Sequence, residues 1–344
     1  MLTKDDCLVL RGLAIMCIIV HNFCHLLPNA VRENEFFYDV GNDHYFMTHV
    51  FTSDFVVQLF SYWGHLGVPV FVFLTGYGLS QKYECSTNIV DKKLFIWRHY
   101  QKFIFPILGG FFSFVIVYLV INGSLWDKWW QTFIMQITMT GNFALHPNSL
   151  IKPGPYWYFG LTMQLYIIYI FFVYRRSLNL FVYIVTASII ILFAVQSKHY
   201  SLIWIKYNSV GWLLPFCIGL YVGRNIHMYN FKVLQLIGSC FISGLLILIL
   251  GSNYYLWLFI SLPSITFFVS VCGILKRGVV YKYALYVGKI SFFLFVTHPI
   301  IREIIRAIIP LDYRYVGLLL YLIIVVLISL VISLIPNPHE LRKS

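Results

Sequence analysis

The stretch that decides the fold is LVLRGLAIMCIIVHNFCH at residues 8–25. It approaches the roughly 20 mostly apolar residues that a helix needs to cross a bilayer, yet it contains Arg11, His21 and His25. Arg11 and His21 are about 15 Å apart along a helix axis, and His25 follows one turn later on the face of His21. Titratable groups inside a membrane span are costly and usually functional. The segment therefore predicts a first transmembrane helix that carries polar chemistry.

The composition of the whole chain agrees with this interpretation. Of its 344 residues, 60% are hydrophobic and 11% are charged, whereas a soluble domain has about 25% charged residues. This excludes soluble enzymes, DNA-binding modules and secreted disulfide scaffolds. The net charge of +12 indicates orientation in a membrane and an anion site, not a nucleic-acid partner. The seven cysteines form no CxxC pair, so neither a disulfide framework nor a zinc site is expected.

Hydropathy predicts an all-α, polytopic membrane bundle of about ten transmembrane helices within a single domain, 1–344, with no additional soluble domain. An eleventh run near 129–140 is too short and polar for a certain span. The ten expected spans lie near 8–27, 62–80, 103–121, 156–174, 178–196, 209–223, 233–251, 256–275, 286–309 and 315–335.

The positive-inside rule orients the chain. The segment between Gln81 and Lys102 is basic and should be cytoplasmic, while the acidic loop 28–61 should lie outside. If 129–140 crossed fully, most later basic segments would fall outside, against the rule. We therefore expect a partial or re-entrant helix at 129–140 and cytoplasmic N and C termini. The basic segments in question are Arg175–Arg176, Arg224–Lys232, Lys276–Arg277–Lys282 and Arg342–Lys343.

A second histidine lies at a depth similar to that of His21. His298, in YVGKISFFLFVTHPIIRE at 286–303, should lie about 18 Å into its span, and His21 about 20 Å into the first. Imidazole titrates near neutral pH, so a pair at this depth suits general-base work or brief acyl carriage. The alternative is a structural histidine bonded across helices. His21 and His25 lack further ligands at useful spacing, so no metal is expected.

Several cations lie at the inner edge of the predicted membrane. Arg11, Arg98 and Lys102 could bind an anionic ligand, because phosphates would neutralise cations at that depth; the alternative is that basic residues there only set the topology. In PGPYWYFGLTMQLYIIY at 153–169, an aromatic belt explains part of the pattern. It does not explain Gln164 in mid-span, which needs a hydrogen-bond partner.

Six segments, in order, resemble the membrane-bound acyltransferase family 3, whose members O-acylate, and mostly O-acetylate, cell-surface sugars in bacteria. The resemblance covers nearly the whole chain. It departs from the family pattern in the spacing of Arg11 and His21, which leaves His21 and His25 as alternatives for the motif histidine, and in Pro69, where the family often has an acidic residue. The segments are LRGLAIMCIIVHNF, GHLGVPVFVFLTGYGLS, WRHYQKFIFP, GPYWYFGLTMQLYIIY, LPFCIGLYVGR and GKISFFLFVTHPII.

The resemblance implies a mechanism. Acetyl-CoA, or another acyl-CoA, would bind from the cytoplasm, and its thioester would reach His21 and His298 near mid-membrane. One histidine, with His25 as the alternative to His21, would deprotonate a sugar or glycolipid hydroxyl arriving from outside. Trp157, Tyr158 and Gln164 would line the channel. The phosphates of the donor would meet Arg11, Arg98, Lys102, Lys92 and Lys93.

Two other classes of function remain open. An exporter of polysaccharide or lipid-linked sugar would also use intramembrane histidine and arginine, although the chain lacks the internal repeat of many transporters. A non-catalytic partner subunit of a surface-polysaccharide assembly would tolerate loss of His21 and His298. The expected location is the inner membrane of a bacterium, with the lipid bilayer as a partner.

Overall fold

Every regular element in the described part of the chain is helical. The computed structural model describes residues 2–84, 89–225, 231–276, 278–310 and 312–335. The prediction of an all-α membrane bundle is confirmed. Some residues used to orient the chain, namely Arg277, Arg342 and Lys343, lie outside the described residues, as do Cys85 and the C terminus.

The helices follow one another with short connections. The 3₁₀ and π segments continue or join the α-helices, and they are η1 (Gly64–Leu66), η2 (Ser80–Glu84), η3 (Gly141–Phe143), η4 (Gly154–Tyr156), η5 (Tyr169–Val173), η6 (Ser209–Trp212) and η7 (Trp257–Phe259). The α-helices are α1 (Lys4–Cys24), α2 (Val40–His49), α3 (Phe55–Trp63), α4 (Gly67–Leu79), α5 (Lys92–Asn122), α6 (Trp129–Thr138), α7 (Pro147–Leu150), α8 (Trp157–Ile168), α9 (Leu178–Val195), α10 (His199–Tyr207), α11 (Leu213–Asn225), α12 (Val233–Gly251), α13 (Ser261–Leu275), α14 (Val279–Lys289), α15 (Ser291–Ile308) and α16 (Arg314–Ser333).

Within the described residues, eight helices are long and apolar enough to cross a membrane, or nine if one bent pair is counted as a span. These eight match eight of the ten expected spans. The expected span 209–223 coincides with η6 and α11, which follow one another without a break over Ser209–Asn225. It is not among these eight, and Asn225 is the last described residue before the gap at 226–230. Helix α6 has 10 residues, about 15 Å, which is too short to cross and agrees with a partial helix.

The expected span 286–309 differs from a single straight helix. Helix α14 ends at Lys289 and α15 begins at Ser291, with a bend of 76° between them. The bend lies at Ile290, whose backbone leaves the helical region (φ −100°, ψ 6°). The expected span is therefore divided between two helices: Tyr286 belongs to α14, and His298 belongs to α15.

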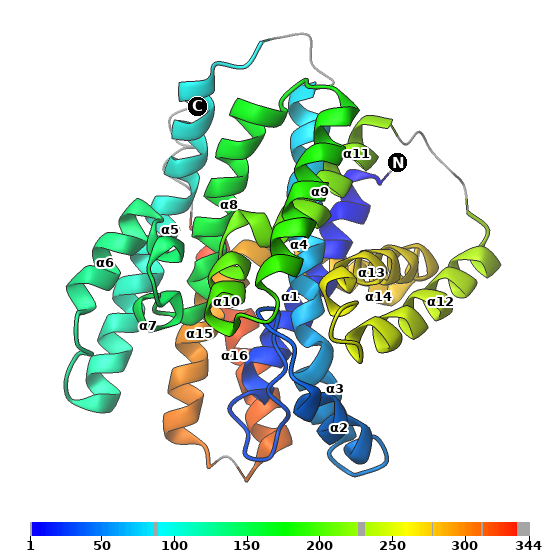
Figure 1. Ribbon diagram of the computed structural model, residues 1–344. Helices are drawn as coiled ribbons and strands as arrows, with labels where there is room; N and C mark the ends of the chain where they lie inside the picture. The colour runs from blue at the N-terminus through cyan, green and yellow to red at the C-terminus, as the bar shows by residue number, and fades with distance from the viewer. Residues whose placement is uncertain (1, 85–88, 226–230, 277, 311, 336–344) are drawn as a thin grey trace.

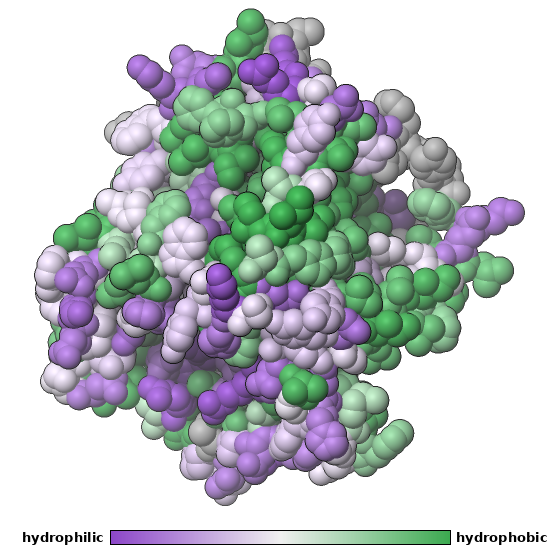
Figure 2. All heavy atoms as spheres, viewed as in Figure 1, coloured by the Kyte–Doolittle hydropathy of each residue, from purple (hydrophilic) through white to green (hydrophobic). Residues whose placement is uncertain are grey.

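Helix α1 passes through the middle of the bundle (Figure 1), with α2 and α3 at one end and α12 to α14 on one side. In the most apolar 18-residue stretch of α1, 61% is buried inside the protein. The corresponding share is 11% in α12 and 17% in α9. Outer helices that expose apolar side chains are typical of a bundle surrounded by lipid. Figure 2 shows this apolar surface over the side of α12 and α13, whereas polar residues lie at the top, along the left flank and towards the bottom of the view.

Candidate functional site

One large cavity, of about 980 Å³, lies inside the bundle. Its wall is formed by the loop before α2 and by parts of α1, η1, α4, α5, η4, α8, α10, α14, α15 and α16. Six of its lining residues lie along α1 and just beyond its end, spaced so that they share one helix face. From the first to the last, this face extends about 26 Å, close to the thickness of a hydrocarbon core. The six are Leu8, Arg11, Ile18, His21, Asn22 and His25.

The end of the cavity near the start of α1 is basic. Arg11 and Lys102, both expected to bind an anion, line this wall, together with Lys289 at the end of α14. Lys289 was not expected at this site, because hydropathy places it inside a continuous span at 286–309. Arg98, Lys92 and Lys93 are exposed along the first turns of α5 and do not line the cavity. Three cations on one wall favour an anionic ligand with more than one negative charge.

A histidine cluster lies further along the same cavity. The ring centroids of His21 and His25 are 4.0 Å apart, and those of His21 and His65 are 5.5 Å apart. All three residues line the cavity. His65 was not among the expected site residues, although a histidine within the apolar run that begins GHLGVPVF stands out in the same way as His21. The cluster gives the cavity a set of imidazole groups that can donate, accept and transfer protons.

The hydrogen bonds of two of these histidines fix their tautomers. The Nδ1 atom of His21 lies 3.1 Å from the carbonyl oxygen of Phe60, and the Nε2 atom of His25 lies 3.1 Å from that of Ser61. A carbonyl oxygen can only accept, so each of these nitrogen atoms donates its proton. In the neutral ring, Nε2 of His21 and Nδ1 of His25 therefore carry the lone pair and can act as bases.

His65 is buried, and neither of its ring nitrogen atoms has a hydrogen-bond partner among the described residues. A buried imidazole without partners loses its hydration without compensation. Such a group is retained where a ligand, a water molecule or a reacting atom completes its hydrogen bonds. His65 is therefore a functional candidate equal to His21.

Close helix packing brings these histidines together. A Cβ atom at Gly64 would lie 2.5 Å from Cβ of His21 and 2.7 Å from the carbonyl oxygen of Cys17, so a larger residue would push α1 away from η1. At Gly67 a Cβ atom would lie 2.5 Å from the carbonyl oxygen of Ala14. The small residues of this motif thus set the approach that places His65 beside His21.

His298 lies apart from the cavity wall. It is fully buried, and its Nδ1 atom is bonded to the carbonyl oxygen of Leu294 in the preceding turn of α15 at 3.1 Å. The Nε2 atom has no partner among the described residues. Its neighbours Thr297 and Ile300 line the cavity, but His298 does not. The structure thus brings His21 and His25 together and leaves His298 behind the wall.

Of the three residues expected to line the channel, two line the cavity and one does not. Trp157 and Tyr158 line the cavity. Gln164 does not: its Nε2 atom donates to Oδ1 of Asn208 at 2.9 Å, and its Oε1 atom accepts the backbone N–H of Ser209 at 2.9 Å. The polar group that stood out in mid-span therefore joins α8 to the junction of α10 and η6.

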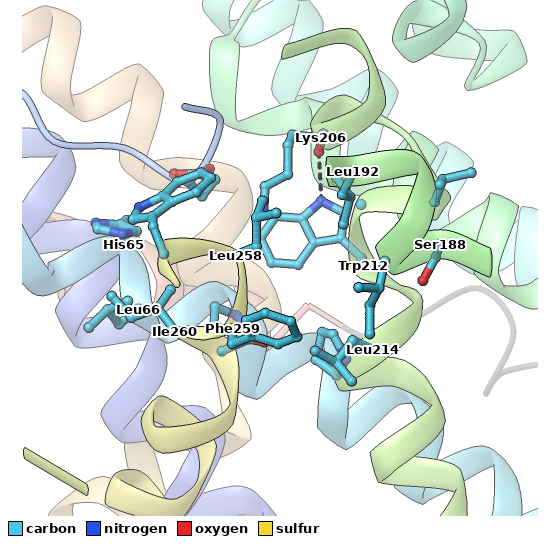
Figure 3. A pocket seen from close by; sticks show the side chains of 18 residues that line it. His65, Leu66, Ser188, Leu192, Lys206, Trp212, Leu214, Leu258, Phe259 and Ile260 are labelled. Carbon is cyan, nitrogen blue, oxygen red and sulfur yellow. Dashed lines mark hydrogen bonds between the residues drawn. The ribbon is translucent and has the colours of Figure 1, made fainter. Parts of the chain in front are cut away.

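A second, much smaller cavity, of about 30 Å³, is lined by residues that include His65, Lys206 and Trp212 (Figure 3). Glu35 and His65 line both cavities. The amino group of Lys206 lies over the rings of Trp212 and Trp257, 4.7 Å and 5.0 Å from their centroids. This volume is of the size of a single water molecule. Neither Glu35 nor Lys206 stands out in the sequence, because a charged residue in a loop or short helix carries no special pattern.

Burial changes the titration of these two groups outside the membrane-spanning helices. It raises the pKa of Glu35 to about 7, and the positive charge of Lys206 opposes this shift. Burial likewise lowers the pKa of Lys206 to about 8, with the carboxylate of Glu35 acting against it. Both groups therefore change charge close to neutral pH, next to the histidine cluster.

Within the described residues, no group of three or more His, Cys, Asp and Glu side chains is arranged to hold a metal ion. The model of one protein family, described as an acyltransferase domain, matches residues 8–337. No curated protein and no solved structure matches the chain. The family match spans the cavity, the histidine cluster and the cations described above.

Proposed function

Because the chain belongs to the acyltransferase 3 family and is a multi-pass membrane protein, we propose that it transfers an acyl group, in the first instance acetyl, from acyl-CoA to a hydroxyl group. The acceptor is a surface polysaccharide or glycolipid sugar. The protein lies in the inner membrane of a bacterium, with its basic segments and both termini in the cytoplasm.

A single observation carries the proposal: one cavity joins a basic end to a histidine end along one face of α1. Arg11, Lys102 and Lys289 would bind the phosphates of the donor from the cytoplasmic side. The pantetheine arm would then follow the cavity, and Trp157 and Tyr158 would contact it. The thioester would come to rest beside His21 and His25.

The chemistry needs a base and a proton donor in turn. His21, held through Nδ1 by the carbonyl group of Phe60, accepts the proton of the acceptor hydroxyl at Nε2. The hydroxyl oxygen forms a bond to the thioester carbon, and the carbon–sulfur bond breaks. The proton then passes from Nε2 to the departing thiolate, so that the histidine returns to its neutral form. His25 is the alternative base, since its Nδ1 atom carries the lone pair.

Calorimetry of acetyl-CoA binding to the purified protein in nanodiscs tests the donor. Arg11→Ala removes a cation from the cavity wall and should weaken binding at least tenfold. The matched control is Lys93→Ala, which removes an exposed cation that does not line the cavity and should leave binding unchanged. If the wild type binds no acyl-CoA at millimolar concentration, the proposal fails and export of a sugar becomes the leading function.

A further inference from the structure

Arg302 lines the same cavity near its histidine end. It lies on α15, and its Nη1 atom faces Oδ1 of Asn22, which lies between His21 and His25 along the chain. Asn22 is 11 positions beyond Arg11, about 16 Å along the axis of α1. Arg302 is therefore well separated from the basic end of the cavity, and the proposed donor site leaves it without a role.

The hydrogen bonds of this guanidinium group are poor. Its Nη1 atom lies 3.4 Å from Oδ1 of Asn22, and its Nη2 atom lies 3.5 Å from Oε1 of Glu303. Both distances exceed the usual range of about 2.7–3.2 Å. Its Nε atom is buried and has no hydrogen-bond partner among the described residues. An arginine so placed is able to form stronger bonds with a ligand.

The charge around Arg302 is also unbalanced. Glu303 is the acidic residue in contact with it, and the other carboxylate oxygen of Glu303 lies 2.7 Å from Nη2 of Arg306. Two arginines thus share one carboxylate, and the closer contact belongs to Arg306. Glu303 therefore balances the charge of Arg302 only in part, and a low dielectric strengthens the attraction of this guanidinium group for an anion.

We propose that Arg302 binds an anionic group of the acceptor, a carboxylate or a phosphate close to the hydroxyl that is acylated. This inference rests on the proposed function and names the chemical class of the acceptor. A planar carboxylate or a phosphate oxygen pair matches the fork of the guanidinium group. The anion fixes the acceptor so that its hydroxyl lies beside His21 or His25.

Binding of three alkyl glycosides with the same octyl chain tests this proposal in nanodiscs of neutral lipid. The probes are octyl glucoside, octyl glucuronide and octyl glucose 6-phosphate, added below micelle-forming concentrations, and the readout is tryptophan fluorescence. We expect the wild type to bind one or both anionic probes at least tenfold more tightly than the neutral one. A preference for the glucuronide alone identifies a carboxylate, and a preference for the phosphate alone identifies a phosphate.

Arg302→Gln should abolish the preference, and Arg302→Lys should keep part of it. The matched control is Arg306→Gln, because Arg306 binds the same Glu303 but does not line the cavity. The proposal is overturned if the wild type binds no anionic probe better than the neutral probe, or if both glutamine variants lose the preference alike. It is also overturned if Arg302→Gln weakens acetyl-CoA binding as much as Arg11→Ala, since Arg302 would then serve the donor.

His21→Ala separates this inference from the proposed function. It should abolish acyl transfer and retain the preference for anionic probes. A wild type that keeps this preference but binds no acyl-CoA would refute the proposed function alone. A wild type that transfers acetyl groups without any preference for an anion would refute only the role of Arg302.

Discussion

The imidazole rings of His21 and His65 lie with their centroids 5.5 Å apart, although one belongs to α1 and the other to the turn between α3 and α4. The nitrogen atoms of His65 have no hydrogen-bond partner among the described residues, whereas His21 is held by the carbonyl group of Phe60. One ring is thus oriented, and the other is available to a ligand. This difference suggests that the two histidines have different roles in the cavity.

His65→Phe should lower kcat about tenfold or more, because the imidazole beside His21 is lost while a ring of similar size remains. Thermal stability should stay the same or rise, since a buried polar group without partners is removed. Turnover and melting temperature, measured on the same preparation, check this. The control is His146→Gln, which changes an exposed histidine. Full activity in His65→Phe would assign His65 to packing alone.

Lys102→Ala and Lys289→Ala should each raise the KM for acyl-CoA about tenfold or more with a small change in kcat, because both cations line the basic end of the cavity and bind phosphate in the proposed complex. The effect should shrink as salt is added, since screening weakens attraction to the phosphates. Steady-state kinetics at two ionic strengths measure both effects. An unchanged KM in both variants would place the donor phosphates elsewhere.

Gly64→Ala should destabilise the protein by about 1–3 kcal/mol and reduce activity, because the new Cβ atom would lie 2.5 Å from Cβ of His21. Gly78→Ala is the matched control on α4: no atom lies within 4 Å of its added Cβ, and alanine favours the helix by up to about 1 kcal/mol. Thermal unfolding in detergent distinguishes the two variants. Equal stability of both would contradict the close approach of α1 and η1.

Glu33 should make the stability depend on pH. Burial raises the pKa of this carboxyl group to about 8, and the hydrogen bond from Asn42 opposes the shift. Between about pH 4.5 and 8 the folded state holds a proton that the unfolded state has released, so stability falls as the pH rises through this window.

Glu33→Gln keeps an acceptor for Asn42 and removes the titration, so its melting temperature should fall less between pH 5 and pH 8 than that of the wild type. Scanning unfolding at several pH values measures the slope. Identical slopes in the two proteins would show that Glu33 ionises normally.

Much of the fold followed from hydropathy, because apolar runs of span length have few alternatives to a membrane helix. The bend at Ile290 did not, since it arises from the backbone of a single residue between two apolar segments. Local irregularities of this kind depend on tertiary packing and leave little trace in composition.

The candidate site was predictable where polarity stood out against an apolar span, as for Arg11 and His21. The same reasoning selected Gln164, whose polar atoms are in fact satisfied by Asn208 and Ser209, because periodicity does not show what lies across a helix interface. Glu35 and Arg302 were not predicted, because only the folded chain brings them to the wall of the cavity. The sequence indicates unusual residues, and the structure shows which of them share a space.

The most direct test of acyl transfer through His21 uses membranes containing the wild type or His21→Ala at equal expression, incubated with acetyl-CoA labelled in the acetyl group. We predict that the wild type moves the label into a glycan or glycolipid fraction as an alkali-labile ester, with transfer in His21→Ala lower by about 10²–10⁴-fold. The loss should occur with unchanged acetyl-CoA binding, since Arg11 and Lys102 remain. Equal incorporation by the two proteins, or none by the wild type above membranes that lack it, would contradict the account.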